Sequence, residues 1–166
     1  MGTARNKRPV IRLLEALEAE EIPYILIGMS AAVLQGVLGQ TLDVDLWIGL
    51  STRQYMRVIN IAIKHGATAA ANTVVYLKDG MPVNFVFEVT GLASFKTEHK
   101  KAHRISFHGK KIPVLPLERI RKSKSAIRRD KDLLHVKLIE EFLRCQKAGK
   151  KGKPATRRPA NPEASN

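Results

Sequence analysis

The spacing of apolar residues changes repeatedly along the first third of the chain. Residues 10–17 are apolar at intervals of three and four, which predicts a helix that follows Pro9. Residues 24–27 are all apolar, which is typical of a strand buried on both faces. Small residues over 31–38 then predict a second helix, and residues 43–48 predict a second strand. The order helix, strand, helix, strand favours an α/β fold.

The remaining pattern predicts helices and hairpins in alternation. The expected elements are a helix over 51–65, strands over 73–77 and 81–89, a short helix over 96–103, strands over 104–108 and 111–115, a helix from Pro116, and a final helix over about 130–147. On the final helix we expect Leu134, Leu138, Phe142 and Cys145 to form the packing stripe. The predicted fold class is therefore α/β (α+β), with a small, mixed and mostly antiparallel sheet flanked by helices and a C-terminal helical element.

Positive charge is concentrated in the second half of the chain. The formal net charge of the 166 residues is +14. Residues 10–95 carry a net charge of −3, whereas residues 96–131 carry +10 and the last twenty residues +5. A basic segment of this density attracts polyanions, so we expect nucleic acid as a partner, and RNA before DNA. A solvated surface is the alternative explanation.

Composition also suggests where the domain ends. We expect a basic arm over residues 1–8, one domain over 9–147, and a disordered basic tail over 148–166, because the tail is rich in Lys, Pro and Ala. No apolar run approaches the roughly 20 residues that span a membrane. Cys145 is the only cysteine, so an internal disulfide is excluded. These features predict a cytoplasmic protein without a membrane partner.

Two carboxylates at the start of the second strand are the sharpest chemical signal. Asp43 and Asp45 alternate with Val44, so their side chains lie on the same face of the strand. Carboxylates this close repel each other unless a cation or hydrogen-bond donors lie between them. Hard cations such as Mg²⁺ take carboxylate oxygens and leave positions open for substrate phosphates. One element upstream, Gly28 allows a tight turn and Ser30 is a candidate helix cap.

The combination of these motifs resembles the nucleotidyltransferase (polymerase-beta-like) fold. The carrying motifs are Gly28-Met29-Ser30 followed by Asp43-Val44-Asp45, the segment PVNFVFEVTGLASF, and the segment KIPVLPLERIRKSKSAIRRDKDLLHVKLI. Among members of that fold, the chain is most similar to the small bacterial and archaeal nucleotidyltransferases, many of which occur in toxin–antitoxin pairs. The resemblance covers about residues 10–143.

The resemblance implies a role for several side chains. Gly28 and Ser30 would bind the phosphates of an NTP substrate, and Asp43 and Asp45 would be the catalytic carboxylates that hold Mg²⁺ or Mn²⁺. Lys124, Arg128 and Asp132 stand four residues apart, so they share one helical face if that helix continues. Lys124 and Arg128 would then contact the nucleotide or RNA. A surface ion-pair ladder is the alternative explanation of this trio.

Two positions depart from the family pattern. Met29 stands where the family has Gly or Ser, and Asn84 stands where the third carboxylate is expected. An amide cannot act as a general base and is a weaker metal ligand than a carboxylate. Glu88 lies four residues further on, about 13 Å along an extended strand, which is too far to replace it without a change of register.

Two functions therefore stay open from the sequence. The first is Mg²⁺-dependent transfer of a nucleotide from NTP to an RNA or protein acceptor, impaired by Asn84. The second is an inactive nucleotidyltransferase-like module that binds nucleic acid or a partner protein, such as a cognate toxin or antitoxin.

Overall fold

The computed structural model describes residues 7–151 and has a seven-stranded mixed sheet at its centre. The strands lie in the order β3-β4-β5-β2-β1-β7-β6. Strand β1 pairs with β7 and β2 with β5 in parallel, and the other four pairings are antiparallel. The strands are β1 (Tyr24–Ile27), β2 (Val44–Ile48), β3 (Thr68–Ala71), β4 (Val74–Tyr76), β5 (Pro82–Val86), β6 (His103–Phe107) and β7 (Lys110–Val114). The predicted mixed, mostly antiparallel sheet is confirmed.

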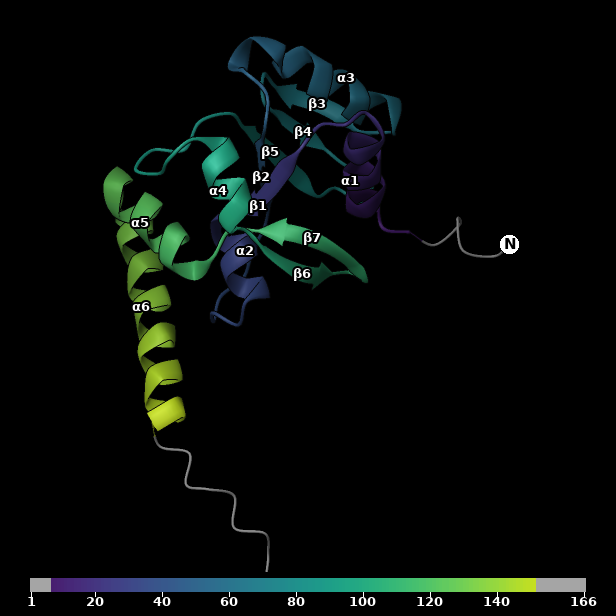
Figure 1. Cartoon of the computed structure of the whole chain (residues 1–166). Coiled ribbons are helices and arrows are strands. Elements are labelled where there is room, and N and C mark those ends of the chain that lie inside the picture. The colour runs from purple at the N-terminus through teal and green to yellow at the C-terminus, as the bar shows by residue number, and fades with distance from the viewer. Residues whose placement is uncertain (1–6, 152–166) are drawn as a thin grey trace, which may run out of the picture.

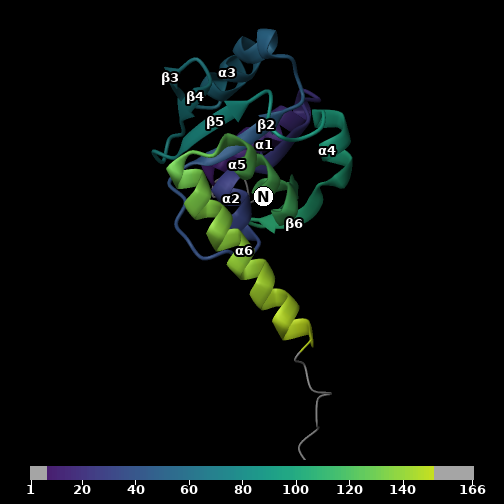
Figure 2. The ribbon, with the colours of Figure 1, turned by 90° about the vertical axis from the view of Figure 1, so that its left-hand side faces the viewer.

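Helices flank this sheet (Figure 1). They are α1 (Pro9–Ala19), α2 (Gly28–Leu34), α3 (Tyr55–Lys64) after the 3₁₀ turn η2 (Thr52–Gln54), α4 (Phe95–Lys101), α5 (Leu117–Ile127) and α6 (Asp130–Lys151). Helices α1 and α3 pack against each other, whereas α5 packs against α6 and α2. The C-terminal part of α6 extends away from the sheet, as Figures 1 and 2 both show. None of the helices over residues 7–151 has both the length and the apolar character needed to cross a bilayer.

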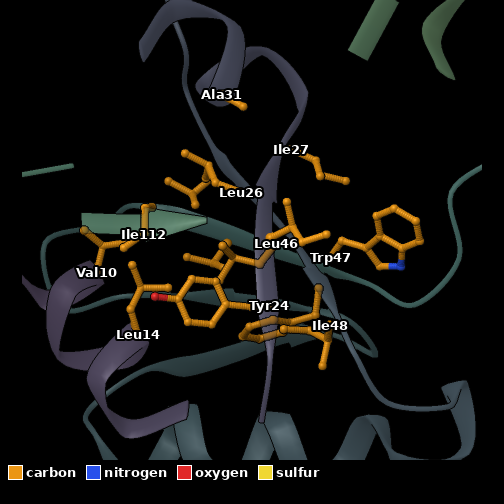
Figure 3. Packing of buried hydrophobic residues seen from close by; sticks show 14 of the residues in the cluster. Val10, Leu14, Tyr24, Leu26, Ile27, Ala31, Leu46, Trp47, Ile48 and Ile112 are labelled. Atoms are coloured by element: carbon orange, nitrogen blue, oxygen red, sulfur yellow. The ribbon is translucent and has the colours of Figure 1, made fainter. Parts of the chain in front are cut away.

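The core lies around β1 and β2. All four residues of β1 are buried, because apolar side chains cover both of its faces. Val10 and Leu14 of α1 lie over Tyr24 and Ile112 (Figure 3). Strand β2 is buried along its length except at Asp45, which is partly exposed. The carboxylate is therefore held by a rigid strand in the middle of the sheet.

Several predicted boundaries differ from the structure. Helix α2 begins at Gly28 itself and ends at Leu34, so Ser30 lies inside the helix and does not cap it. Strand β3 was not predicted; its sequence Thr-Ala-Ala-Ala is exposed throughout and has weak strand propensity. It forms because it pairs with β4 at the edge of the sheet.

The C-terminal helices also differ from the prediction. The helix that starts at Pro116 does not continue through Arg128, whose left-handed backbone (φ +59°) separates α5 from α6. On α6, Leu138 and Phe142 pack against the core, but Leu134 is 58% exposed and Cys145 is exposed. Ile139 is fully buried in their place.

The ends of the predicted domain lie at the edges of the described residues. Lys7 of the predicted arm forms an ion pair with Glu15 at 2.8 Å, and residues 1–6 lie outside the described part. Helix α6 extends to Lys151, past the predicted domain end at 147. The rest of the predicted tail, residues 152–166, also lies outside it.

Candidate active site

Three polar side chains converge where β5 runs beside the start of β2. The parallel pairing of these strands places Asn84 directly opposite Asp45. The Asn84 side-chain amide donates to Asp45 Oδ1 at 2.9 Å and to Asp43 Oδ2 at 3.1 Å. The register therefore places Asn84 beside both carboxylates, and its amide occupies the space between them.

Gly28 forms the floor beside Asp45. The antiparallel pairing of β1 and β2 sets Ile27 opposite Asp45, and the chain turns into α2 at the next residue with φ +70°. A Cβ atom at Gly28 would overlap Asp45 Oδ2 and lie 3.2 Å from Cγ. Glycine is therefore required here both by the backbone angle and by the carboxylate.

Ser30, which was predicted to bind phosphate together with Gly28, lies in a different environment. Ser30 is 8% exposed, and its hydroxyl donates to the Ile27 carbonyl at 3.0 Å. It does not line the cleft that Gly28 and Met29 line. Met29, and not Ser30, therefore lines the cleft beside Gly28, and the predicted phosphate contact of Ser30 would need a rearrangement.

The opposite wall of the cleft comes from α5 and α6. Asp132 on α6 is fully buried and accepts from Arg129 Nε at 2.6 Å and from Lys124 Nζ at 3.4 Å. Lys131 also lines the cleft, whereas Arg128 does not. The predicted proximity of Lys124 and Asp132 thus agrees with the structure. The arginine that contacts Asp132, however, is Arg129 and not the predicted Arg128, because the helix is interrupted at Arg128 and the residues after it face other directions than a continuous helix would give.

Together these walls enclose an open cleft of about 460 Å³. Its lining joins residues from β1, α2, β2, β5, α5 and α6: Ile27, Gly28, Met29, Asp43, Asp45, Thr73, Asn84, Phe85, Val86, Glu88, Val89, Thr90, Ser123, Lys124, Ile127, Arg129, Lys131, Asp132 and His135. Carboxylates form one side of the cleft and cationic side chains the other, which is a suitable arrangement for a metal ion with an anionic ligand.

The electrostatics of the two walls differ. Burial raises the pKa of Asp45, and so does the neighbouring Asp43; the Asn84 hydrogen bond and Lys124 lower it but do not offset the rise. Burial also raises the pKa of Asp132, but the hydrogen bond from Arg129 and the charge of Lys124 outweigh burial and leave that pKa below its usual range. The charge of Asp132 is therefore compensated within the wall, whereas the Asp43–Asp45 pair would gain from an added cation.

Two cleft residues were not predicted to belong to the site. His135 stands one helical turn after Asp132, and burial together with Lys124 lowers its pKa, which keeps the imidazole neutral at pH 7. Its Nδ1 is buried and has no hydrogen-bond partner in the part of the chain described. Glu88 is exposed and lines the cleft after β5 has ended. The sequence signals were the three-residue spacing from Asp132 to His135 and the position of Glu88 four residues after Asn84.

The donor set determines which metal the site suits. Over residues 7–151, no cluster of three or more His, Cys, Asp or Glu side chains is placed to hold a metal ion. The Asp43 and Asp45 carboxylates nevertheless converge on one point, since both lie within 3.1 Å of the same amide nitrogen. Two hard oxygen ligands suit Mg²⁺, which keeps several waters and takes further oxygens from substrate phosphates. The residues present therefore fit one such ion once the Asn84 amide, which lies between the carboxylates, moves aside.

Comparison with solved structures identifies the fold. The antibiotic-resistance factor ANT(2″)-Ia superposes with a TM-score of 0.58 at 14% identity, over 85% of each chain. The lincosamide antibiotic adenylyltransferase LnuA gives 0.54 at 14% identity, over 82% of this chain and 98% of its own. This chain has the nucleotidyltransferase fold. An antigenic nucleotidyltransferase-like protein from Paracoccidioides brasiliensis gives 0.50 at 15% identity, over 81% of this chain and 75% of its own.

The likeness to nucleotidyltransferases is one of structure. No protein-family model matches the chain, and no curated protein matches it in sequence. The nucleotidyltransferase fold expected from the glycine turn and the Asp-x-Asp strand is thus confirmed by the arrangement of the sheet and helices.

Proposed function

We propose that this chain is a nucleotidyltransferase that binds a nucleoside triphosphate with Mg²⁺ or Mn²⁺ in the cleft and transfers the nucleotide to an acceptor hydroxyl on RNA or protein. The observation that supports it most is the convergence of Asp43 and Asp45 opposite the cationic side chains of Lys124, Arg129 and Lys131. Phosphoryl transfer requires mainly positioning and charge neutralisation, which such a cleft supplies.

The roles of the residues follow from their surroundings. Asp43 and Asp45 would hold the metal ion, which when bound supplies positive charge to the phosphates and orients them. Gly28 leaves room for the Asp45 carboxylate, because a Cβ atom there would overlap Asp45 Oδ2. Lys124 is close enough to lower the pKa of Asp45 and would contact phosphate oxygens from the opposite wall.

The reaction joins the acceptor oxygen to the α-phosphorus and breaks the bond to pyrophosphate, and the acceptor hydroxyl loses a proton. Asn84 cannot take up that proton. The Glu88 carboxylate and the His135 imidazole line the same cleft, and the neutral imidazole of His135 can accept a proton at pH 7. Catalysis by this chain would therefore depend on one of these groups or on water.

Label transfer tests the proposal. Full-length protein is incubated with Mg²⁺, RNA and each NTP labelled at the α-phosphate. Label should enter RNA or protein while pyrophosphate is released, and Asp43→Asn with Asp45→Asn should abolish transfer. Absence of transfer with every NTP, in Mg²⁺ and in Mn²⁺, would overturn it.

Asn84 favours a second candidate function. Its amide donates to both carboxylates, so the pair is satisfied without a metal ion. The chain would then be a non-catalytic module that binds nucleic acid or a partner protein, such as a toxin or antitoxin. Calorimetric titration with NTP and Mg²⁺ separates the two: binding supports the transferase, and no heat at millimolar NTP supports the module.

A further inference from the structure

A group of exposed cations follows α4, α5 and the start of α6 without forming ion pairs. Six Lys and Arg side chains in this region are exposed and have no salt-bridge or hydrogen-bond partner over residues 7–151. We call these six residues the basic band: Lys96, Lys100, Lys101, Lys122, Arg128 and Lys131. Because no acidic partner neutralises these cations, their charges add to a positive potential that attracts anions.

The three helices that carry the basic band are held together by buried polar contacts. The Glu98 carboxylate on α4 is fully buried and forms an ion pair with Arg119 of α5. The loop before α4 lies directly on α5, since a Cβ at Gly91 would be 2.7 Å from Ala126. Lys124 of α5 reaches Asp132 of α6 at 3.4 Å. These contacts use Arg119 and Lys124 to hold α4, α5 and α6 against one another.

The basic band leads to the cleft. Figure 2 shows α5 and α6 toward the viewer, with α4 at the right-hand edge of the molecule. Lys131, at the α6 end, lines the cleft. The band therefore reaches the cleft that Asp43 and Asp45 line.

The chemistry of the basic band points to a phosphate backbone and not to bases. Phe95 is the aromatic residue closest in sequence to the α4 lysines, and its ring packs edge-on against Trp47 at 5.5 Å. Base-stacking platforms need exposed aromatic rings, whereas lysines on helices contact phosphates irrespective of sequence. The other half of the molecule, residues 10–95, carries a net charge of −3 and would repel the same ligand.

We infer that the basic band binds the phosphate backbone of a single-stranded RNA and guides one end of it into the cleft as the acceptor. The inference deepens the proposed function and rests on it for the acceptor role, but the binding itself does not require nucleotide transfer. Binding to single strands that neutralises Z phosphates gives a slope of about −0.7Z in log K against log salt. Removal of three contacts should therefore make the slope about 2 less steep and weaken binding about 100-fold at 0.1 M salt.

Fluorescence anisotropy of a labelled, unstructured 20-nucleotide RNA measures this in EDTA without NTP. The test variant of the full chain is Lys96→Gln, Lys100→Gln, Lys101→Gln. Its control, Arg53→Gln, Lys64→Gln, Lys78→Gln, removes the same charge from exposed positions on η2, α3 and the β4–β5 turn. Thermal unfolding confirms that both variants fold. The expected result is the loss of slope and affinity in the test variant alone.

Three outcomes would overturn the inference. Equal losses in both variants would mean that net charge alone attracts RNA. Unchanged binding in the test variant would place the RNA elsewhere. Tighter binding to vesicles with anionic lipid than to RNA would assign the band to a membrane surface. If RNA binds through the band but no label is transferred, the binding role of the band is supported and the proposed transferase function is refuted. The two failures are therefore distinguishable.

Discussion

The Asp45 carboxylate occupies the space that a side chain at Gly28 would need. A Cβ atom there would overlap Asp45 Oδ2, and the backbone angle of +70° disfavours any other residue. The turn into α2 and the carboxylate of β2 are thus built as one unit. Steric exclusion at Gly28 decides where the Asp45 oxygens can be.

Replacement of Gly28 by alanine should therefore displace Asp45. We expect Gly28→Ala to lower the free energy of unfolding by about 3 kcal/mol, since left-handed strain and the overlap add. Gly80→Ala is the matched control, because Gly80 has φ +85° and a methyl group added there would have no neighbour within 4 Å; it should lose about 1 kcal/mol. Urea unfolding measures both, and equal losses would contradict the role of the carboxylate contact.

Asn84→Asp should make the protein dependent on a cation. The change removes two donated hydrogen bonds and brings a third negative charge to Asp43 and Asp45, so the free energy of unfolding in EDTA should fall by about 2–3 kcal/mol. Mg²⁺ or Mn²⁺ should restore it. Asn60→Asp adds the same charge at an exposed position of α3 and should change stability by less than about 0.5 kcal/mol. If metal ions stabilise both variants equally, the site does not bind them.

The buried Asp132 should make stability dependent on pH. Because its folded-state pKa lies below the usual value, it stabilises the folded state at pH values above about 4, and this contribution is lost as the pH falls through the folded-state pKa. Asp132→Asn should therefore cost about 3 kcal/mol at pH 7 and progressively less as the pH falls through the folded-state pKa. Asp130→Asn, exposed in the same helical turn, is the control. A loss independent of pH would show that the ion pairs with Lys124 and Arg129 contribute little.

Lys124 should contribute to nucleotide affinity from the cationic wall. Loss of a charge-assisted contact costs about 1.5–3 kcal/mol, so Lys124→Met should weaken NTP binding about 10- to 100-fold in calorimetry with Mg²⁺. Lys122→Met, on the same helix but exposed and outside the cleft, should leave the Kd unchanged. Similar affinities in both variants would move the nucleotide away from this wall.

The sequence predicted the elements whose signals are local. The run Tyr24–Ile27 is fully apolar and ends in glycine, and the structure has β1 at the same residues. The Asp43–Asp45 pair and Asn84 were predicted to be neighbours, and the register of β2 and β5 places them together. The fold followed because the motifs occur in an order that few folds share.

The remaining features depend on tertiary contacts that no local pattern carries. Strand β3 is held by pairing at the sheet edge and not by the propensity of Thr-Ala-Ala-Ala. The break at Arg128 has neither glycine nor proline to indicate it, so the facing side chains were assigned one residue off. His135 lines the cleft because α6 starts at Asp130, and this start determines which side chains of the helix face the cleft.

The left-handed backbone of Arg128 has a practical consequence for protein engineering. Glycine adopts this angle without strain, so Arg128→Gly should raise the free energy of unfolding by about 1 kcal/mol. A screen for thermal stability would therefore select this substitution. That gain would remove an exposed cation at the corner where α5 meets α6. Stabilised variants of this protein should therefore be checked for RNA affinity before use, because selection for a stronger fold would remove a positive charge from the basic band.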